Sequence, residues 1–176
     1  MKKLFSFVAA ALMSVAMFAG PNDLLWDYSA GAPSENPDNG LSYASKITDG
    51  PGVKNGLYGI KLNSSGYAAF TKAAVAGTLK LGFGPRSGTS ATSVAVYTWA
   101  GDTPTAETLI TTTAELTEYG YVQVDLPAEY TNIYLKRGGS VETALQVIQF
   151  TEYVPRAFTD FKIEFRTDPM TVILPE

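Results

Sequence analysis

The sequence of 176 residues contains no His and no Cys, so chemistry could rest only on side chains such as Asp, Glu, Lys, Arg, Tyr and Ser. This composition excludes the Ser-His-Asp triad, the Cys-His pair, thiolate and imidazole zinc sites, disulfides and haem attachment. Neither a Gly-x-Ser-x-Gly elbow nor a phosphate-binding glycine loop occurs. Two kinds of activity remain, which are carboxylate chemistry and non-covalent binding.

Carboxylates alone can hydrolyse a glycosidic bond if two of them lie at the right separation and one has a raised pKa. The acidic residues here are scattered over turns and solvated strand faces, as in the pairs Glu115 with Glu118 and Asp102 with Glu107. None lies within an apolar run that would raise its pKa. We therefore expect a protein that is not an enzyme. A fragment of a glycan-degrading enzyme that uses carboxylates stays an alternative.

No cofactor and no metal site are expected from the motifs. Carboxylate and carbonyl oxygens near Asp23, Asp27 or Asp49 could hold a structural calcium ion. These acids lack the spacing of a calcium-binding loop. The question of a calcium ion therefore stays open at this stage.

A candidate ligand site lies in the loops that should gather at one end of a sheet domain, because successive antiparallel connections fall at alternate ends. Tyr supplies a flat apolar ring face and Arg supplies paired donors, which together suit a sugar. The alternative is that the arginines only pair with neighbouring glutamates, which contributes little. The loops are 63–66, 84–92, 114–120 and 138–143, and the side chains in them are Arg86, Glu118, Tyr119 and Glu142, with Arg137 at the edge.

At the opposite end, Trp99 follows a strand and precedes a Gly-Asp turn, near the loop 129–131. Its ring could cap the core or serve as a platform for a ligand. Trp26 follows Leu24 and Leu25, and this apolar context favours burial. The candidate ligand-binding residues are therefore Arg86, Tyr119, Arg137 and Trp99.

The elements that must position these residues are β-strands. Short runs of β-branched and aromatic residues alternate with clusters of Gly, Pro, Asn, Asp and Ser, and no stretch keeps a helical period. A short helical turn or a loop is expected at 71–77. The clearest strands are 57–62, 67–71, 78–83, 93–99, 108–113, 121–126, 132–136 and 145–150, with a first strand around Trp26 and Tyr28.

Several of these strands alternate between apolar and polar residues. Leu79, Leu81 and Phe83 share one face of their strand, while Thr78 and Lys80 lie on the other. One buried and one solvated face is typical of antiparallel sheets. Half-buried strands at short intervals predict an all-β fold, an antiparallel two-sheet β-sandwich or jelly roll, in preference to a closed barrel.

The first 19 residues have the layout of a secretory signal peptide. Lys2 and Lys3 precede an apolar run, and small residues lead to Pro21. Cleavage could follow Ala16 or Ala19. A membrane anchor is the alternative, although the run is shorter than the ~20 residues of a span. Loss of the two lysines changes the net charge from -4 to -6, which argues against nucleic acid and anionic membranes as partners.

The segment after residue 153 starts a new pattern. Pro155 interrupts the chain, and Phe161, Ile163 and Phe165 then alternate with polar residues. We expect a signal peptide at 1–19, a sandwich domain at 20–153, and at 154–176 a joint followed by the start of a second β module. The alternative is that 158–176 adds strands to the sandwich.

Four stretches, followed by the Pro joint, carry a family resemblance: "LLWDYSA", "GIKLNSSGYAAFTKAAVAGTLKLGFGPRSG", "VAVYTW" and "VDLPAEYTNIYLKRGGSVETALQVIQF". Between residues 24 and 153 the chain resembles the galactose-binding-like and carbohydrate-binding-module-like β-sandwiches of secreted polysaccharide-acting and surface proteins of Gram-negative bacteria. The shared features are mostly packing features. The resemblance implies a secreted accessory module, periplasmic or at the cell surface, with a glycan as ligand and possible attachment to a downstream domain. A structural spacer or adhesion module without a small ligand is the alternative.

Overall fold

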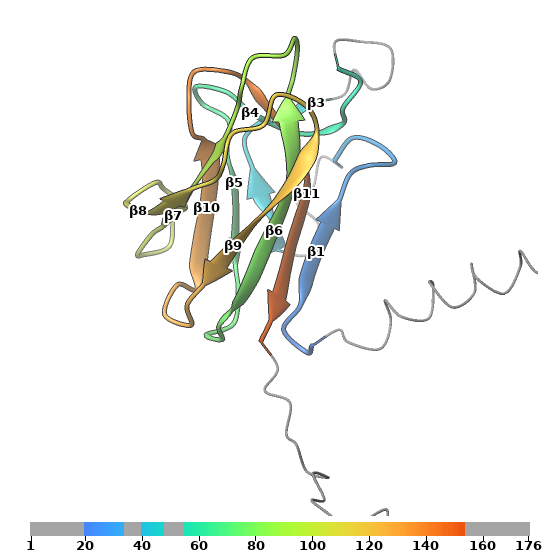
Figure 1. Cartoon of the computed structure of the whole chain (residues 1–176). Coiled ribbons are helices and arrows are strands. Elements are labelled where there is room, and N and C mark those ends of the chain that lie inside the picture. The colour runs from blue at the N-terminus through green and yellow to red at the C-terminus, as the bar shows by residue number, and fades with distance from the viewer. Residues whose placement is uncertain (1–19, 34–39, 48–54, 154–176) are drawn as a thin grey trace, which may run out of the picture.

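The computed structural model describes residues 20–33, 40–47 and 55–153, and every named element in these ranges is a β-strand. The strands form two antiparallel sheets that pack face to face (Figure 1). The predicted all-β, antiparallel two-sheet sandwich is thereby confirmed. Within the described residues, no helix is long and apolar enough to cross a membrane.

The six-stranded sheet is built around β11, which runs the length of the sandwich. The first residues of β11 pair with β4, and later ones pair with β1 on the same side, through Leu145↔Ile60 and Ile148↔Trp26 respectively. On its other side β11 pairs with β6, which pairs with β9 at the edge. The strands are β1 (Leu24–Asp27), β3 (Lys46–Ile47), β4 (Gly59–Leu62), β6 (Gly77–Pro85), β9 (Gly120–Leu126) and β11 (Thr143–Glu152).

The five-stranded sheet has the order β2-β5-β10-β7-β8. A register shift between Val96 and Tyr97 interrupts the pairing of β7 with β8. The strands are β2 (Ser42–Tyr43), β5 (Ala68–Thr71), β7 (Val94–Thr98), β8 (Thr108–Thr112) and β10 (Asn132–Arg137).

The core lies between the sheets and follows the alternation that the sequence predicts. Leu79, Leu81 and Phe83 of β6 are fully buried, as are Ile133 and Leu135 of β10. Burial of each such side chain contributes about 1.5 to 3 kcal/mol relative to exposure, which holds the sandwich together without disulfides. The opposite face of β6 therefore carries the side chains that remain available to solvent.

The structure agrees with the predicted burial of Trp26 and with the loop that is one of the two alternatives for 71–77. Trp26 is buried, and its ring centroid lies 5.1 Å from that of Phe70 across the core. Residues 72–76 form a loop and not a helical turn. The predictions for 1–19 and 154–176 lie outside the described residues.

Candidate functional site

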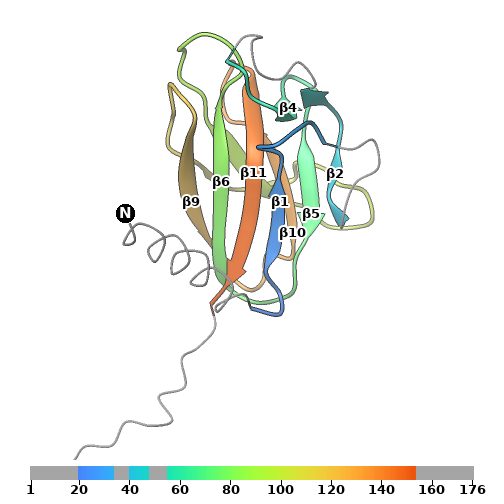
Figure 2. The same cartoon turned by 90° about the vertical axis from the view of Figure 1, so that its right-hand side faces the viewer.

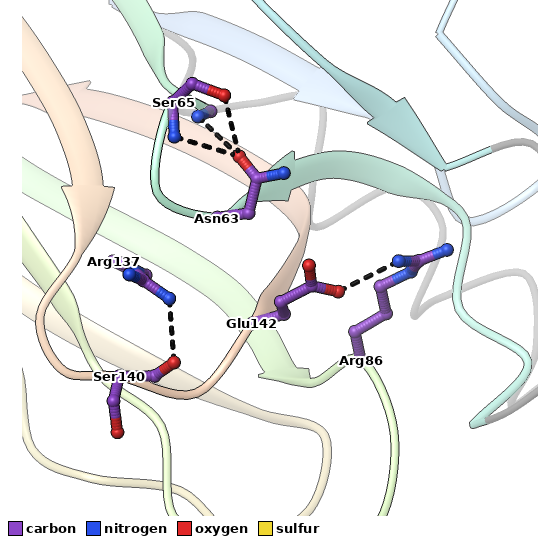
Figure 3. A network of polar contacts seen from close by, with 7 residues as sticks. Asn63, Ser65, Arg86, Arg137, Ser140 and Glu142 are labelled. Atoms are coloured by element: carbon purple, nitrogen blue, oxygen red, sulfur yellow. Dashed lines mark hydrogen bonds and ion pairs between the residues drawn. The ribbon is translucent and has the colours of Figure 1, made fainter.

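The predicted gathering of loops at one end is confirmed. Backbone hydrogen bonds join them in pairs: Arg86 N donates to Glu142 O at 2.9 Å, and Gly138 N donates to Ser93 O at 2.7 Å. Figure 3 shows the side chains that lie at this end, with Glu142 next to Arg86 and Arg137 near Ser140. The strand order thus brings together residues that are 45 and 56 positions apart in the chain.

The arginines at this end are bound within the loops. Arg86 Nη1 lies 2.9 Å from Glu142 Oε2, and the two side chains are 15% and 41% exposed. Arg137 Nη1 donates to the carbonyl of Ser140 at 2.7 Å. Both guanidinium groups thus stabilise the loop geometry. A ligand would have to compete with these bonds or share them.

Trp99 lies at the opposite end of the sandwich and is 8% exposed. Its carbonyl accepts a hydrogen bond from Asn132 Nδ2 at 3.1 Å, which ties the end of β7 to the start of β10. A ring this deeply buried covers the core. Of the two roles considered for Trp99, the geometry matches the cap.

Tyr119 projects from the loop end onto the outer face of the six-stranded sheet. A Cβ atom built at Gly82 would lie 2.6 Å from the Tyr119 hydroxyl, and one built at Gly84 would lie 2.9 Å from Tyr119 Cα. Two glycines on β6 therefore leave the space that Tyr119 occupies. Burial raises the pKa of the Tyr119 hydroxyl, and the neighbouring Tyr121 hydroxyl adds to the shift.

Tyr119 is one of three tyrosines on this face, which Figure 2 shows with β9, β6, β11 and β1 side by side. We call this surface the tyrosine face. The ring centroids of Tyr119 and Tyr121 are 5.5 Å apart, edge to face. Tyr121 and Tyr153 are 53% and 55% exposed. The tyrosine face consists of Thr78, Lys80, Tyr119, Tyr121, Gln123, Asp125, Gln149, Thr151 and Tyr153.

The strand register arranges the tyrosine face in rows. Lys80 of β6 is paired with Gln123 of β9 on one side and with Gln149 of β11 on the other. In the next row, Thr78 is paired with Asp125 and Thr151. Side chains paired across strands stand about 5 Å apart. The centre of the face is therefore a cation between two amides.

Polar contacts fix the part of the face around Asp125 and Tyr153. The Tyr153 hydroxyl donates to Asp125 Oδ1 at 2.5 Å, and Thr78 Oγ1 lies 3.0 Å from the same hydroxyl. Lys80 Nζ lies 4.3 Å from the centroid of the Tyr121 ring, which is a cation–π contact. A depression of about 330 Å³ lies between these groups and is lined by Thr78, Lys80, Gln123, Gln149, Thr151 and Tyr153.

Two other hollows have different walls. A groove of about 580 Å³ lies between the edge strands β8 and β9, where Ile110, Val122 and Val124 form an apolar floor beside the single ring of Tyr130. A hollow of about 310 Å³ at the loop end includes Asn55, Glu118 and Tyr119. Neither lining contains a lysine, whereas the depression on the tyrosine face contains Lys80 between two glutamines.

The acids considered for calcium make backbone contacts. Asp23 accepts the N–H of Gly20 and of Glu152 at 2.9 and 2.8 Å, and Asp27 accepts the N–H of Ser29 at 2.8 Å. Asp49 lies outside the described residues. In the ranges that are described, no cluster of three or more acidic side chains could hold a metal ion.

Sequence reasoning missed the tyrosine face apart from Tyr119. The alternation within β6 and β9 indicates only that their polar residues face solvent, because the pattern of one strand does not show which strands pair with it. A usable signal exists in the glycines 82 and 84, which interrupt the outer face of an otherwise regular strand. A glycine in a strand often marks the close approach of another group.

Comparisons with known proteins find no family match and only distant structural likenesses. No known family profile and no curated protein matches the sequence. A structure from work on glycan recognition by the Ruminococcus flavefaciens cellulosome is 20% identical, with a TM-score of 0.45, and the match covers 76% of this chain and 97% of that one.

Two further structures show the same level of likeness. The CBM22-1 and GH10 modules of Clostridium thermocellum endo-1,4-β-D-xylanase 10B, complexed with xylohexaose, are 14% identical with a TM-score of 0.46, over 77% of this chain and 30% of that one. The catalytic unit of a GH87 α-1,3-glucanase from Streptomyces thermodiastaticus is 14% identical with a TM-score of 0.42, over 78% and 27%. These values concern the fold alone, so the function is argued below from the residues of this chain.

Proposed function

We propose that this chain is a secreted, non-catalytic module that binds carbohydrate through the tyrosine face. The observation that carries the proposal is the grouping of three tyrosines around Lys80 on one exposed sheet face. The rings of Tyr121 and Tyr153 are exposed on the same sheet face, and exposed apolar side chains that gather in one patch, unlike those scattered singly, mark binding sites. A ligand-binding role would explain why these rings are exposed.

The chemistry of the face suits a sugar. The faces of pyranose rings present C–H groups that pack on aromatic rings, and their edges present hydroxyl groups that need donors and acceptors. Tyr121 and Tyr153 supply rings, while Gln123 and Gln149 supply amides that can both donate and accept. The face is open and shallow, which fits a segment of a polymer better than an enclosed small molecule.

The geometry of the carboxylates supports a non-catalytic role. Asp125 on β9 and Asp27 on β1 lie on strands separated by β6 and β11. Three strand spacings separate the two strands by about 14 Å, and the register sets the two acids a further four residues apart along the strands, whereas glycosidases need about 5 to 9.5 Å between their two carboxyl groups. Asp125 is also held by the Tyr153 hydroxyl. These two acids are therefore poorly placed for acid and base catalysis.

The proposal is tested by measuring retention on a panel of polysaccharides, with release of reducing sugar measured in parallel. We expect retention without release. Tyr121→Ala should weaken retention at least tenfold while changing stability by less than about 1 kcal/mol, because the residue is exposed. Leu109→Ala is the matched control, since Leu109 has the same exposed fraction of 53% on β8 in the other sheet.

Three outcomes would contradict the proposal. Product release that a single Asp or Glu substitution abolishes would favour the enzyme alternative. Retention that is lost in Arg137→Ala but kept in Tyr121→Ala would place the site at the loop end that the sequence predicts. Absence of retention on every polysaccharide would favour a structural spacer.

Secretion is the part of the proposal that depends on residues 1–19. The basic start, apolar run and small residues before Pro21 support export and removal of this segment. N-terminal sequencing of the protein from its native host tests this directly. We expect a mature chain that begins at or shortly after Met17, and an intact Met1 would reject export.

A further inference from the structure

The centre of the tyrosine face carries a positively charged side chain, Lys80, that forms no ion pair within the described residues. Lys80 is half-buried on β6. The Lys80 ammonium lies over the ring of Tyr121, with Nζ 4.3 Å from the ring centroid. A half-buried ammonium group attracts a group of opposite charge more strongly than a fully exposed one does, because the surrounding protein screens the attraction less than water does.

The carboxylate next to Lys80 on this face is already engaged. Asp125 stands one row away on β9, and its Oδ1 accepts the Tyr153 hydroxyl at 2.5 Å. Thr78 Oγ1 lies 3.3 Å from the same oxygen. These contacts hold the acid towards Tyr153. The Lys80 ammonium is therefore left without a carboxylate in direct contact, and a ligand can supply one.

The two neighbours in this row are amides. Gln123 and Gln149 flank Lys80 through the pairing of β6 with β9 and β11. Each amide carries two N–H donors, and the ammonium carries three. A carboxylate accepts hydrogen bonds from all three groups, and charge-assisted bonds are roughly twice as strong as those to a neutral hydroxyl. The row therefore matches a carboxylate better than it matches a hydroxyl group.

The face extends beyond this row in both directions. Asp125 follows Tyr121 by four positions along β9, which corresponds to about 13 Å. The Tyr153 hydroxyl is hydrogen-bonded to Asp125, so the Tyr153 ring lies at the opposite end of the face from Tyr121. A ligand that contacts Tyr121 and Tyr153 together must be longer than one sugar ring, and its middle would lie over Lys80.

On the basis of the proposed function, we propose that the tyrosine face binds an acidic polysaccharide and that Lys80, Gln123 and Gln149 receive the carboxylate of an internal uronic acid residue. Tyr121 and Tyr153 then pack against the sugars on either side. The net charge of the whole chain is negative. Its long-range repulsion is screened beyond about 8 Å at physiological salt, so the local charge decides the contact.

The test compares polymers that differ in one group. Polygalacturonate, alginate and hyaluronan are each offered beside the same polymer after chemical reduction of its carboxyl groups to neutral hydroxymethyl groups. We expect at least one uronate polymer to be retained tenfold more tightly than its reduced form. Lys80→Met should remove that difference, and Lys80→Arg should preserve most of it. Tyr121→Ala should weaken retention of both forms.

The outcomes separate this inference from the proposed function. Equal or stronger retention of every reduced polymer would overturn the uronate inference and leave carbohydrate binding in place, as would retention of neutral glycans only. A preference for the acidic form that persists in Lys80→Met would overturn the role of Lys80. No retention of any polysaccharide would overturn both. Thermal unfolding of each variant confirms that the loss is not due to unfolding.

Discussion

The hydroxyl oxygen of Tyr119 lies 2.6 Å from the position that a Cβ atom would take at Gly82. The same position would be 2.8 Å from Tyr121 Cε1 and 3.0 Å from Val147 Cβ. Gly82 therefore provides space for three side chains at once. The positions of both tyrosine rings on the sheet face depend on the absence of a single methyl group from β6.

Gly82→Ala should displace these rings. We expect a loss of about 1 to 3 kcal/mol in the free energy of unfolding, because overpacking forces the neighbours to move. Retention on polysaccharide should fall as well, since Tyr121 leaves its position. Gly139→Ala is the matched control, because a Cβ atom there has no heavy atom within 4 Å. A stable Gly82→Ala variant that binds like the parent would show that the rings are not held as described. Urea unfolding and polymer retention are the two measurements.

Lys72 is a buried cation that joins two loops. Its Nζ donates to the carbonyls of Val75 at 2.7 Å and of Ala73 and Pro127 at 3.3 Å. Lys72→Met keeps most of the apolar stem but leaves these carbonyls without their donor. We expect a loss of about 1 to 3 kcal/mol, measured by urea unfolding. Lys136→Met on β10 is the control and should change stability by less than about 0.5 kcal/mol. Equal effects in the two variants would contradict a structural role for the buried ammonium.

We expect ionisation of Tyr134 to lower the free energy of unfolding in alkaline solution. Burial raises its pKa, with a smaller contribution from Tyr67, whose ring stacks on it with the centroids 4.9 Å apart. In the unfolded chain the hydroxyl ionises near pH 10, while in the folded protein it still holds its proton. The stabilising contribution is complete below pH 10 and is lost as the pH rises through the raised pKa. Unfolding measured from pH 8 to 11 should show this decline, and Tyr134→Phe should make it less steep. An unchanged slope would contradict the assignment.

The pair Arg86 and Glu142 should matter for stability more than for binding. The ion pair is partly buried and is reinforced by a backbone bond between the same residues. Arg86→Ala should cost about 1 kcal/mol, while retention on polysaccharide should stay within a factor of two of the parent. Urea unfolding and polymer retention of Arg86→Ala and Glu142→Gln measure both effects. A tenfold loss of retention in a folded Arg86→Ala variant would instead support the loop end as the ligand site.

Much of the sandwich follows from local pattern in the sequence. The alternation of Leu79, Leu81 and Phe83 with polar residues predicted both the strand and its buried face, and the structure places all three at full burial. The gathering of loops around Arg86 and Glu142 also followed, because antiparallel strands send alternate connections to the same end. These inferences need only the period of a strand and the direction of its neighbours.

The candidate site was decided by tertiary structure. Lys80 lies between Gln123 and Gln149 only because β6 pairs with β9 on one side and with β11 on the other, at one particular register. A shift of one residue would turn each of these side chains to the other face of its strand. The sequence by itself determined that Tyr121 lies on the polar face of a strand whose other face carries Val122 and Val124, and that Tyr119 lies in the loop before that strand. Only the packing of distant strands determined that their rings lie over the glycines of β6, because the contact joins segments almost 40 residues apart whose pairing no local pattern specifies.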